Sequence, residues 1–132
     1  GRNVEVWGNE ETSLDEGNGI ILAMARKPMT KFRKLKVDFF YTKENFDKIK
    51  AGYIAESMDD KWDIVYEDDW LHFYRSWTGI EIYRAKFTPL SDGNYKLQEI
   101  LVNNDENQAD EVVNDNYDRF MVEHLIQDWL LK

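Results

Sequence analysis

Between Lys61 and Val102 the chain alternates short runs of β-branched and aromatic residues with polar turns rich in Asp, Asn, Ser and Gly. The runs are too short to favour helices, and the turns are too short for crossover connections, so neighbouring strands must run antiparallel. The segment is therefore expected to form a β-meander of four or more strands. The expected strands cover residues 62–66, 70–75, 80–87 and 95–102.

A short helix and a further strand are expected before the meander. Thr42 is a suitable N-cap, apolar residues follow it at helical spacing, and Gly52 can end the helix. These signals predict a helix over residues 43–51. Residues 35–41 are rich in β-forming side chains and are expected to form a strand.

An amphipathic helix is expected at the C-terminal end. Asn114 or Asp115 can cap it, and it should continue to about residue 131. Its apolar stripe is broad enough to lie across a sheet. The stripe contains Tyr117, Phe120, Met121, His124, Leu125 and Trp129, and it is widened by Val122, Ile126 and Leu130.

Together these elements predict an α+β fold, an antiparallel β-meander of four or more strands packed against the C-terminal amphipathic helix. A chain of 132 residues is expected to form a single domain over residues 1–132. Residues 1–19 are mostly polar and are expected to be a loosely ordered N-terminal segment. Residues 20–28 fit either a short helix or a strand, which Pro28 would end.

The composition restricts the chemistry open to the chain. It contains no cysteine, which excludes disulfides, thiolate catalysis and cysteine-ligated zinc. No apolar run approaches the roughly 18 residues needed to cross a bilayer, so no membrane association is expected. The formal net charge of −9 argues against DNA or RNA as a partner. These features favour a cytoplasmic protein.

The charges are unevenly distributed along the sequence. Residues 26–36 contain six basic side chains and no acid, whereas residues 104–118 contain six acidic side chains and no base. We expect these blocks to face each other, either within one chain or across a homodimer.

No catalytic or metal-binding signature is present in the sequence. His72 in a strand and His124 on the C-terminal helix would have to converge in space to act together, and single histidines at such positions are usually structural. The acidic segment 105–110 lacks the glycine and the distal glutamate of a calcium loop. We therefore expect no catalytic residue, no metal and no cofactor, and a binding protein is favoured over an enzyme.

The segment from Arg75 to Gly79 has the most suggestive chemistry. Arginine forms bidentate hydrogen bonds with phosphate, and hydroxyls donate hydrogen bonds. Tryptophan stacks on a base, and the N–H groups of a turn can form a concavity for an anion. The alternative is that these residues have only structural roles. The glycine would then supply a positive φ, and the hydroxyls would form hydrogen bonds with the backbone of the turn. The indole would pack on the C-terminal helix, and the arginine would pair with an acid. The candidate ligand-binding residues are Arg75, Ser76, Trp77, Thr78 and Gly79, with aromatic walls from Tyr83 and Trp70.

The run from Lys61 to Tyr83 resembles a motif of small uncharacterised bacterial and phage-type proteins, W-x-I-x-x-E-D-x-L-x-F-x-R-S-W-T-G-x-x-I-Y. The resemblance extends over residues 60–131, through Val102-Asn103-Asn104-Asp105 and the leucine-rich C-terminal helix. This chain has one extra residue before Leu71, so its turn can differ from that of the family. The resemblance implies the same fold and a shared role for residues 75–79, but no established activity.

Two functions remain open at this point. The first is a non-catalytic module that binds a small phosphorylated or nucleotide-like ligand, such as a sequestering protein in conflict between bacteria and phages. The second is an acidic immunity or inhibitor protein that binds a basic protein partner, suggested by the acids in residues 56–69 and 104–118.

Overall fold

The computed structural model describes residues 25–57, 59–108 and 114–132. The expectation for residues 1–19, and that for residues 20–24, lie outside the described residues. Residues 25–28 are not helical, and Lys27 forms one isolated parallel bridge with Ile80.

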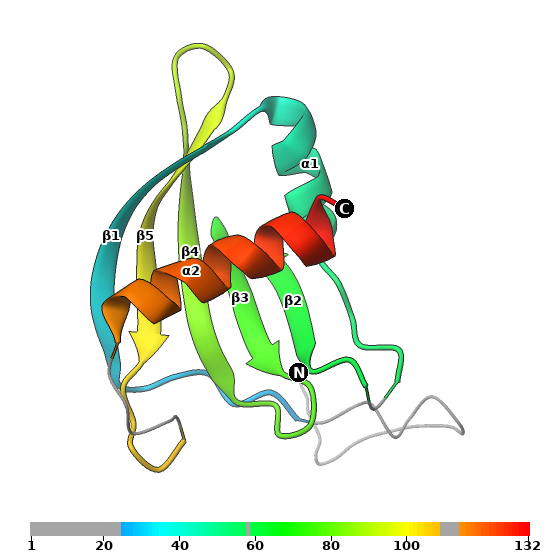
Figure 1. The fold of residues 1–132 in the computed structure, drawn as a ribbon, viewed down its shortest axis with the longest axis vertical. Coiled ribbons are helices and arrows are strands. Elements are labelled where there is room, and N and C mark those ends of the chain that lie inside the picture. Colours follow the sequence, from blue (N-terminus) through cyan, green and yellow to red (C-terminus); the bar gives the residue numbers. More distant parts are fainter. Residues whose placement is uncertain (1–24, 58, 109–113) are drawn as a thin grey trace.

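A five-stranded antiparallel sheet and two helices make up the described fold (Figure 1). The elements in chain order are β1 (Phe32–Tyr41), α1 (Lys43–Ala51), β2 (Trp62–Glu67), β3 (Trp70–Arg75), β4 (Glu81–Pro89), β5 (Tyr95–Asn103) and α2 (Asp115–Leu125), which continues as a π-helical stretch over Ile126–Leu130. The strand order is β1-β5-β4-β3-β2. The α+β fold, the antiparallel meander and both expected helices are confirmed.

The tight turn between β2 and β3 shows how local sequence fixes the strand pairing. Asp68 and Asp69 have φ values of 54° and 71°. Positive φ at both central residues is typical of the two-residue hairpin turn whose twist matches that of the strands, and Asp tolerates this conformation better than most residues. The turn sets the register that pairs Glu67 with Trp70 and, at the other end of the hairpin, Trp62 with Arg75.

The helix α2 lies across one face of the sheet, with the short α1 beside its C-terminal end (Figure 1). Val122, Leu125 and Ile126 are almost completely buried between this helix and the sheet, as expected from the stripe. The expectation that Tyr117 and Phe120 belong to the buried stripe is wrong, because they are 55% and 59% exposed. In the first turn of α2, the buried residue is Asp118.

The opposite face of the sheet contains a buried carboxylate at the start of β4. The β3–β4 register shifts so that Phe73 pairs with Tyr83 but Tyr74 pairs with Glu81, leaving Ile82 as an extra residue. Such a bulge redirects side chains on the bulged strand. It places Glu81 within hydrogen-bonding distance of His72 and Arg84.

Within the described ranges, Arg33 joins the basic block to the acidic block. Arg33 forms ion pairs with Asp115 and Asp118, so the expectation that the blocks face each other is confirmed for this residue. A homodimer stays a prediction. Among the helices in the described ranges, none is long and apolar enough to cross a membrane.

Candidate ligand-binding pocket

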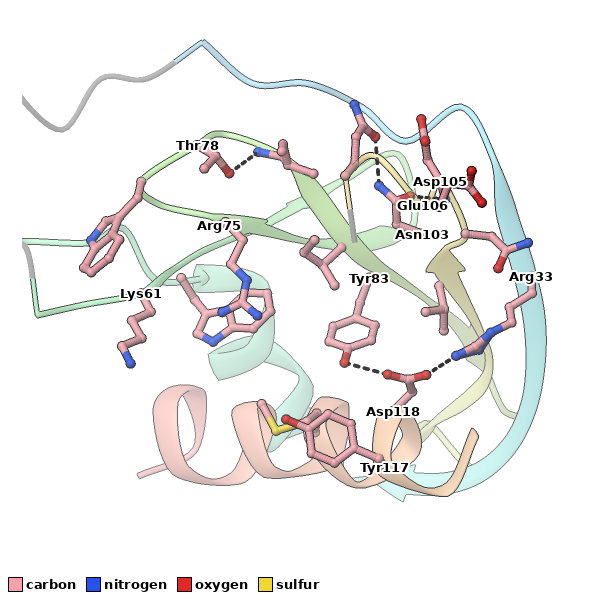
Figure 2. Close-up of a pocket in the computed structure, with 18 residues that line it drawn as sticks. Arg33, Lys61, Arg75, Thr78, Tyr83, Asn103, Asp105, Glu106, Tyr117 and Asp118 are labelled. Carbon is pink, nitrogen blue, oxygen red and sulfur yellow. Dashed lines mark hydrogen bonds and ion pairs between the residues drawn. The ribbon is translucent and has the colours of Figure 1, made fainter. Parts of the chain in front are cut away.

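A pocket of about 640 Å³ lies between the sheet and the first half of α2 (Figure 2). Its floor comes from β2, β4 and β5, and its sides come from the turn after β3, the turn after β5 and the helix. Arg33 from β1 closes one side. The pocket therefore collects residues that are up to 88 positions apart in the sequence, from Arg33 to Met121.

The floor of the pocket is aromatic and apolar. Trp62 and Tyr83 are buried and stack with ring centroids 5.9 Å apart. Ile82 and Val102 complete this surface. The bulge at the start of β4 explains why both Ile82 and its neighbour Tyr83 can line the same pocket.

Arg75 lies over the face of Trp62, its cross-strand neighbour, with its guanidinium carbon 4.4 Å from the ring centroid. In the described ranges, its guanidinium forms no ion pair with a carboxylate. A cation–π contact uses the face of the guanidinium and leaves its N–H groups at the edge. Arg75 is therefore held in place while its N–H groups can still bind an anion.

Ser76 is buried and its polar groups are used in the fold. Its N–H donates to the carbonyl oxygen of Lys61 at 3.0 Å, and its hydroxyl donates to the carbonyl oxygen of Asp60 at 2.5 Å. These bonds fasten residues 60 and 61 to the turn after β3. Their consequence is that Lys61 lines the pocket on the same side as Arg75 (Figure 2).

Hydrogen bonds within residues 75–80 close the rest of the turn. The N–H of Gly79 donates to the carbonyl oxygen of Arg75 at 2.7 Å, and the hydroxyl oxygen of Thr78 accepts from the N–H of Ile80 at 3.2 Å. A hydroxyl that accepts one hydrogen bond still has its own hydrogen to donate. Thr78 can therefore offer a donor to a ligand, whereas Gly79 shapes the turn.

Replacing Gly79 with alanine is expected to destabilise the fold by about 2 kcal/mol. Gly79 has a φ of +77°, and an added Cβ would lie only 2.1 Å from the carbonyl oxygen of Ala25. Gly93→Ala is the matched control, because its φ is +89° but an added Cβ would meet nothing within 4 Å. Urea denaturation should show a loss of about 1 kcal/mol for the control. Equal losses would contradict the close approach at residue 79.

The predicted aromatic walls are only partly brought together. Trp77 lines the pocket and is 55% exposed, and Tyr83 forms part of the floor. Trp70 lies outside the pocket at the opposite end of β3, where Lys86 lies over its ring at 5.6 Å. The pocket instead gains Tyr117 of α2, which is also 55% exposed.

Tyr83 and Asp118 connect the floor of the pocket to α2. The Tyr83 hydroxyl donates to Oδ1 of Asp118 at 2.9 Å, and Arg33 pairs with the other carboxylate oxygen (Figure 2). Burial, together with the nearby Asp118 carboxylate, raises the pKa of Tyr83 well above its usual range. Both hydroxyl and carboxylate are thus engaged in holding the helix on the sheet.

The pocket has two chemically different ends. The cationic end consists of Lys61, Arg75 and Thr78, and the acceptor end consists of Asp105, Glu106 and Gln108 in the turn after β5. Figure 2 shows Lys61 and Arg75 on one side of Tyr83, and Asp105 and Glu106 on the other.

Several pocket residues were not among the sequence candidates. Lys61 could have been found, because antiparallel pairing of the β2–β3 hairpin places the residue before Trp62 next to the residue after Arg75. No comparable local pattern in the sequence identified the residues of the acceptor end. Its position depends on β5 lying beside β4, and on α2 returning over the sheet.

The histidines lie outside the pocket. His72 contacts Glu81 at 2.6 Å on the opposite face of the sheet, and His124 contacts Asp128 at 2.8 Å on α2 and its π-helical extension. In the described part of the chain, no group of three or more His, Cys, Asp or Glu residues could hold a metal ion.

Comparison with protein-family models, curated proteins and solved structures gives no match. The family resemblance of residues 60–131 stays a prediction.

Proposed function

We propose that this protein binds a small phosphorylated, nucleotide-like ligand in the pocket and holds it without turnover, as a sequestering protein would. The observation that supports this most is the position of Arg75, which is fixed on the face of Trp62 at 4.4 Å with no ion pair to a carboxylate in the described ranges. An oriented guanidinium at the edge of a pocket is suited to a phosphate group.

The neighbours of Arg75 suit the same ligand group. Lys61 contributes a second positive charge and Thr78 a hydroxyl donor. A chain with a net charge of −9 repels phosphate in general, so binding depends on this local concentration of positive charge. Arginine and lysine on one side of a pocket can provide that local potential.

An aromatic side chain in the pocket suits a base. Tyr117 lines the pocket and is 55% exposed, so its ring is accessible to a base, whereas Trp77 lines the cationic end and is also 55% exposed. Stacking of a base on an aromatic side chain contributes about 1–3 kcal/mol. A volume of about 640 Å³ lies within the ordinary range for small-molecule sites, roughly 300–1,000 Å³.

A nucleotide is expected to raise the melting temperature of the protein, and Arg75→Ala is expected to weaken that effect. Ligand at a hundred times its dissociation constant adds about 2.7 kcal/mol, or roughly 10 °C for a chain of this size. Loss of charge-assisted hydrogen bonds should weaken binding about 10- to 100-fold. Differential scanning fluorimetry with nucleoside 5′-phosphates and inorganic phosphate measures both effects.

Lys86→Ala is the matched control, because it also removes a cation from the face of a tryptophan, but outside the pocket. It should leave the nucleotide shift unchanged. Recovery of the nucleotide unaltered after incubation would support binding without turnover. If no nucleotide shifts the melting temperature, the proposal fails, and a salt-sensitive complex with a basic protein would then favour an acidic inhibitor.

A further inference from the structure

The acceptor end of the pocket is built around the amide of Asn103, which is 4% exposed. Its Nδ2 donates to the carbonyl oxygen of Glu81 at 2.8 Å and to Oε1 of Gln108 at 3.1 Å, while its Oδ1 accepts from the N–H of Asp105 at 2.8 Å. Because the backbone partners of Asn103 fix which side of its amide carries oxygen, they also fix the amide of Gln108. The Nε2 of Gln108 is therefore left as a donor.

The carboxylates at this end are acceptors only. Oδ1 of Asp105 accepts from the N–H of Asn107 at 2.9 Å, which leaves its second oxygen for other partners. In the described ranges, neither Asp105 nor Glu106 forms an ion pair with Lys or Arg. The residues that line the acceptor end thus include two carboxylates, which can only accept, and one amide with a donor left over.

We propose that the base of the bound nucleotide is guanine, with its Watson–Crick edge at the acceptor end and its phosphate at the cationic end. This inference rests on the proposed function. Guanine presents two adjacent donors, N1–H and N2–H₂, which a carboxylate of Asp105 or Glu106 can accept together, and an O6 acceptor that suits Nε2 of Gln108.

The other bases fit this pattern less well. Adenine presents the lone pair of N1 beside its amino group, and cytosine presents the lone pair of N3, so each would face a carboxylate with an unfavourable acceptor. Uracil offers one N–H between two carbonyl oxygens. Guanine alone among these bases offers adjacent donors.

Isothermal titration calorimetry of the full chain with GMP, IMP and AMP tests the inference. A bidentate contact distinguishes bases by roughly 5- to 100-fold, so GMP is expected to bind more tightly than AMP by a factor in this range. IMP keeps N1–H but lacks the exocyclic amine, and it should fall between the two.

The double variant D105N/E106Q should abolish the preference for GMP over AMP, because it removes the carboxylate that accepts from N1–H and N2–H₂ of guanine and relieves the contact between a carboxylate and the N1 lone pair of adenine. The asparagine keeps the Oδ1 that accepts from Asn107. Asp92→Asn is the matched control, because Asp92 accepts from the N–H two residues ahead in the same way, at 3.0 Å, but outside the pocket. It should keep the GMP preference.

The outcomes separate the base assignment from the proposed function. Equal affinities for GMP and AMP, or a preference for AMP, would overturn the guanine assignment while leaving nucleotide binding in place. A GMP preference that survives in the double variant would overturn the role of the carboxylates. Absence of binding by all the nucleotides would overturn the proposed function itself.

Discussion

Replacing Glu81 with alanine is expected to destabilise the protein by about 3–5 kcal/mol, which is the range for removing one partner of a buried ion pair. The Glu81 side chain is completely buried. Its carboxylate accepts from Arg84 at 2.7 and 2.9 Å and contacts Nδ1 of His72 at 2.6 Å. It also accepts from the N–H of Met29 at 3.0 Å, which ties the segment before β1 to the start of β4.

The loss is large because the partners of Glu81 are too buried for all of them to form replacement hydrogen bonds with water. The Arg84 and His72 side chains are only 24% and 14% exposed, and the N–H of Met29 is in a buried residue. Groups left buried without partners cost more than the hydrogen bonds that they formed. Urea denaturation at neutral pH measures the loss.

Glu99→Ala is the control for this substitution. Glu99 is in the neighbouring strand β5 and pairs with the exposed Lys34 at 3.9 Å. A pair of this kind contributes at most about 1 kcal/mol. If Glu81→Ala were no more damaging than Glu99→Ala, the carboxylate would have no special structural role.

The pH dependence of stability gives a second readout of Glu81. Burial alone would raise the pKa of this carboxyl, but hydrogen bonds from Arg84, His72 and Met29 outweigh it and lower the pKa from 4.5 to about 2. Because the folded-state pKa is below the unfolded one, the stabilisation is complete above about pH 4.5 and is lost as the pH falls toward 2. It amounts to about 3 kcal/mol. Glu81→Gln should flatten this part of the stability curve.

The sheet could be predicted because its signals are local. Alternating apolar residues identified the strands, and Asp68-Asp69 and Gly79 marked turns whose φ values are positive in the structure. The buried face of α2 was harder to predict, since apolar character alone placed Tyr117 and Phe120 in the stripe. Asp118 takes a buried place there because of Arg33 and Tyr83, which come from distant strands.

The same distinction applies to the pocket. Arg75 ends β3, and Trp77 and Thr78 lie in the turn that follows, so their proximity is a local property. The sequence could not show that the Ser76 hydroxyl donates a hydrogen bond to the carbonyl oxygen of Asp60. Nor could it show that Trp70 lies at the end of β3 that is away from the pocket. These facts depend on which backbone groups the fold leaves unsatisfied, and that is decided by tertiary packing.

Asp118→Ala is expected to destabilise the protein by about 2–4 kcal/mol, because it removes the carboxylate that joins α2 to two strands. The Asp118 residue is 8% exposed and accepts from the Tyr83 hydroxyl at 2.9 Å while pairing with Arg33. Without it, the buried Tyr83 hydroxyl loses its acceptor. The wall that α2 provides to the pocket should also lose its attachment to the floor.

Asp115→Ala is the control for Asp118→Ala, because it removes a negative charge near Arg33 without removing the buried contact between α2 and the sheet. Asp115 pairs with the same guanidinium at 3.1 Å, but its side chain is 50% exposed, so its removal should cost less than about 1 kcal/mol. Tyr83→Phe should reproduce part of the Asp118→Ala loss, since it deletes the other partner of the hydrogen bond. Chemical denaturation of these variants measures the comparison. Similar losses for Asp115→Ala and Asp118→Ala would show that both aspartates act only through surface charge, and the proposed attachment of α2 to the pocket floor would be wrong.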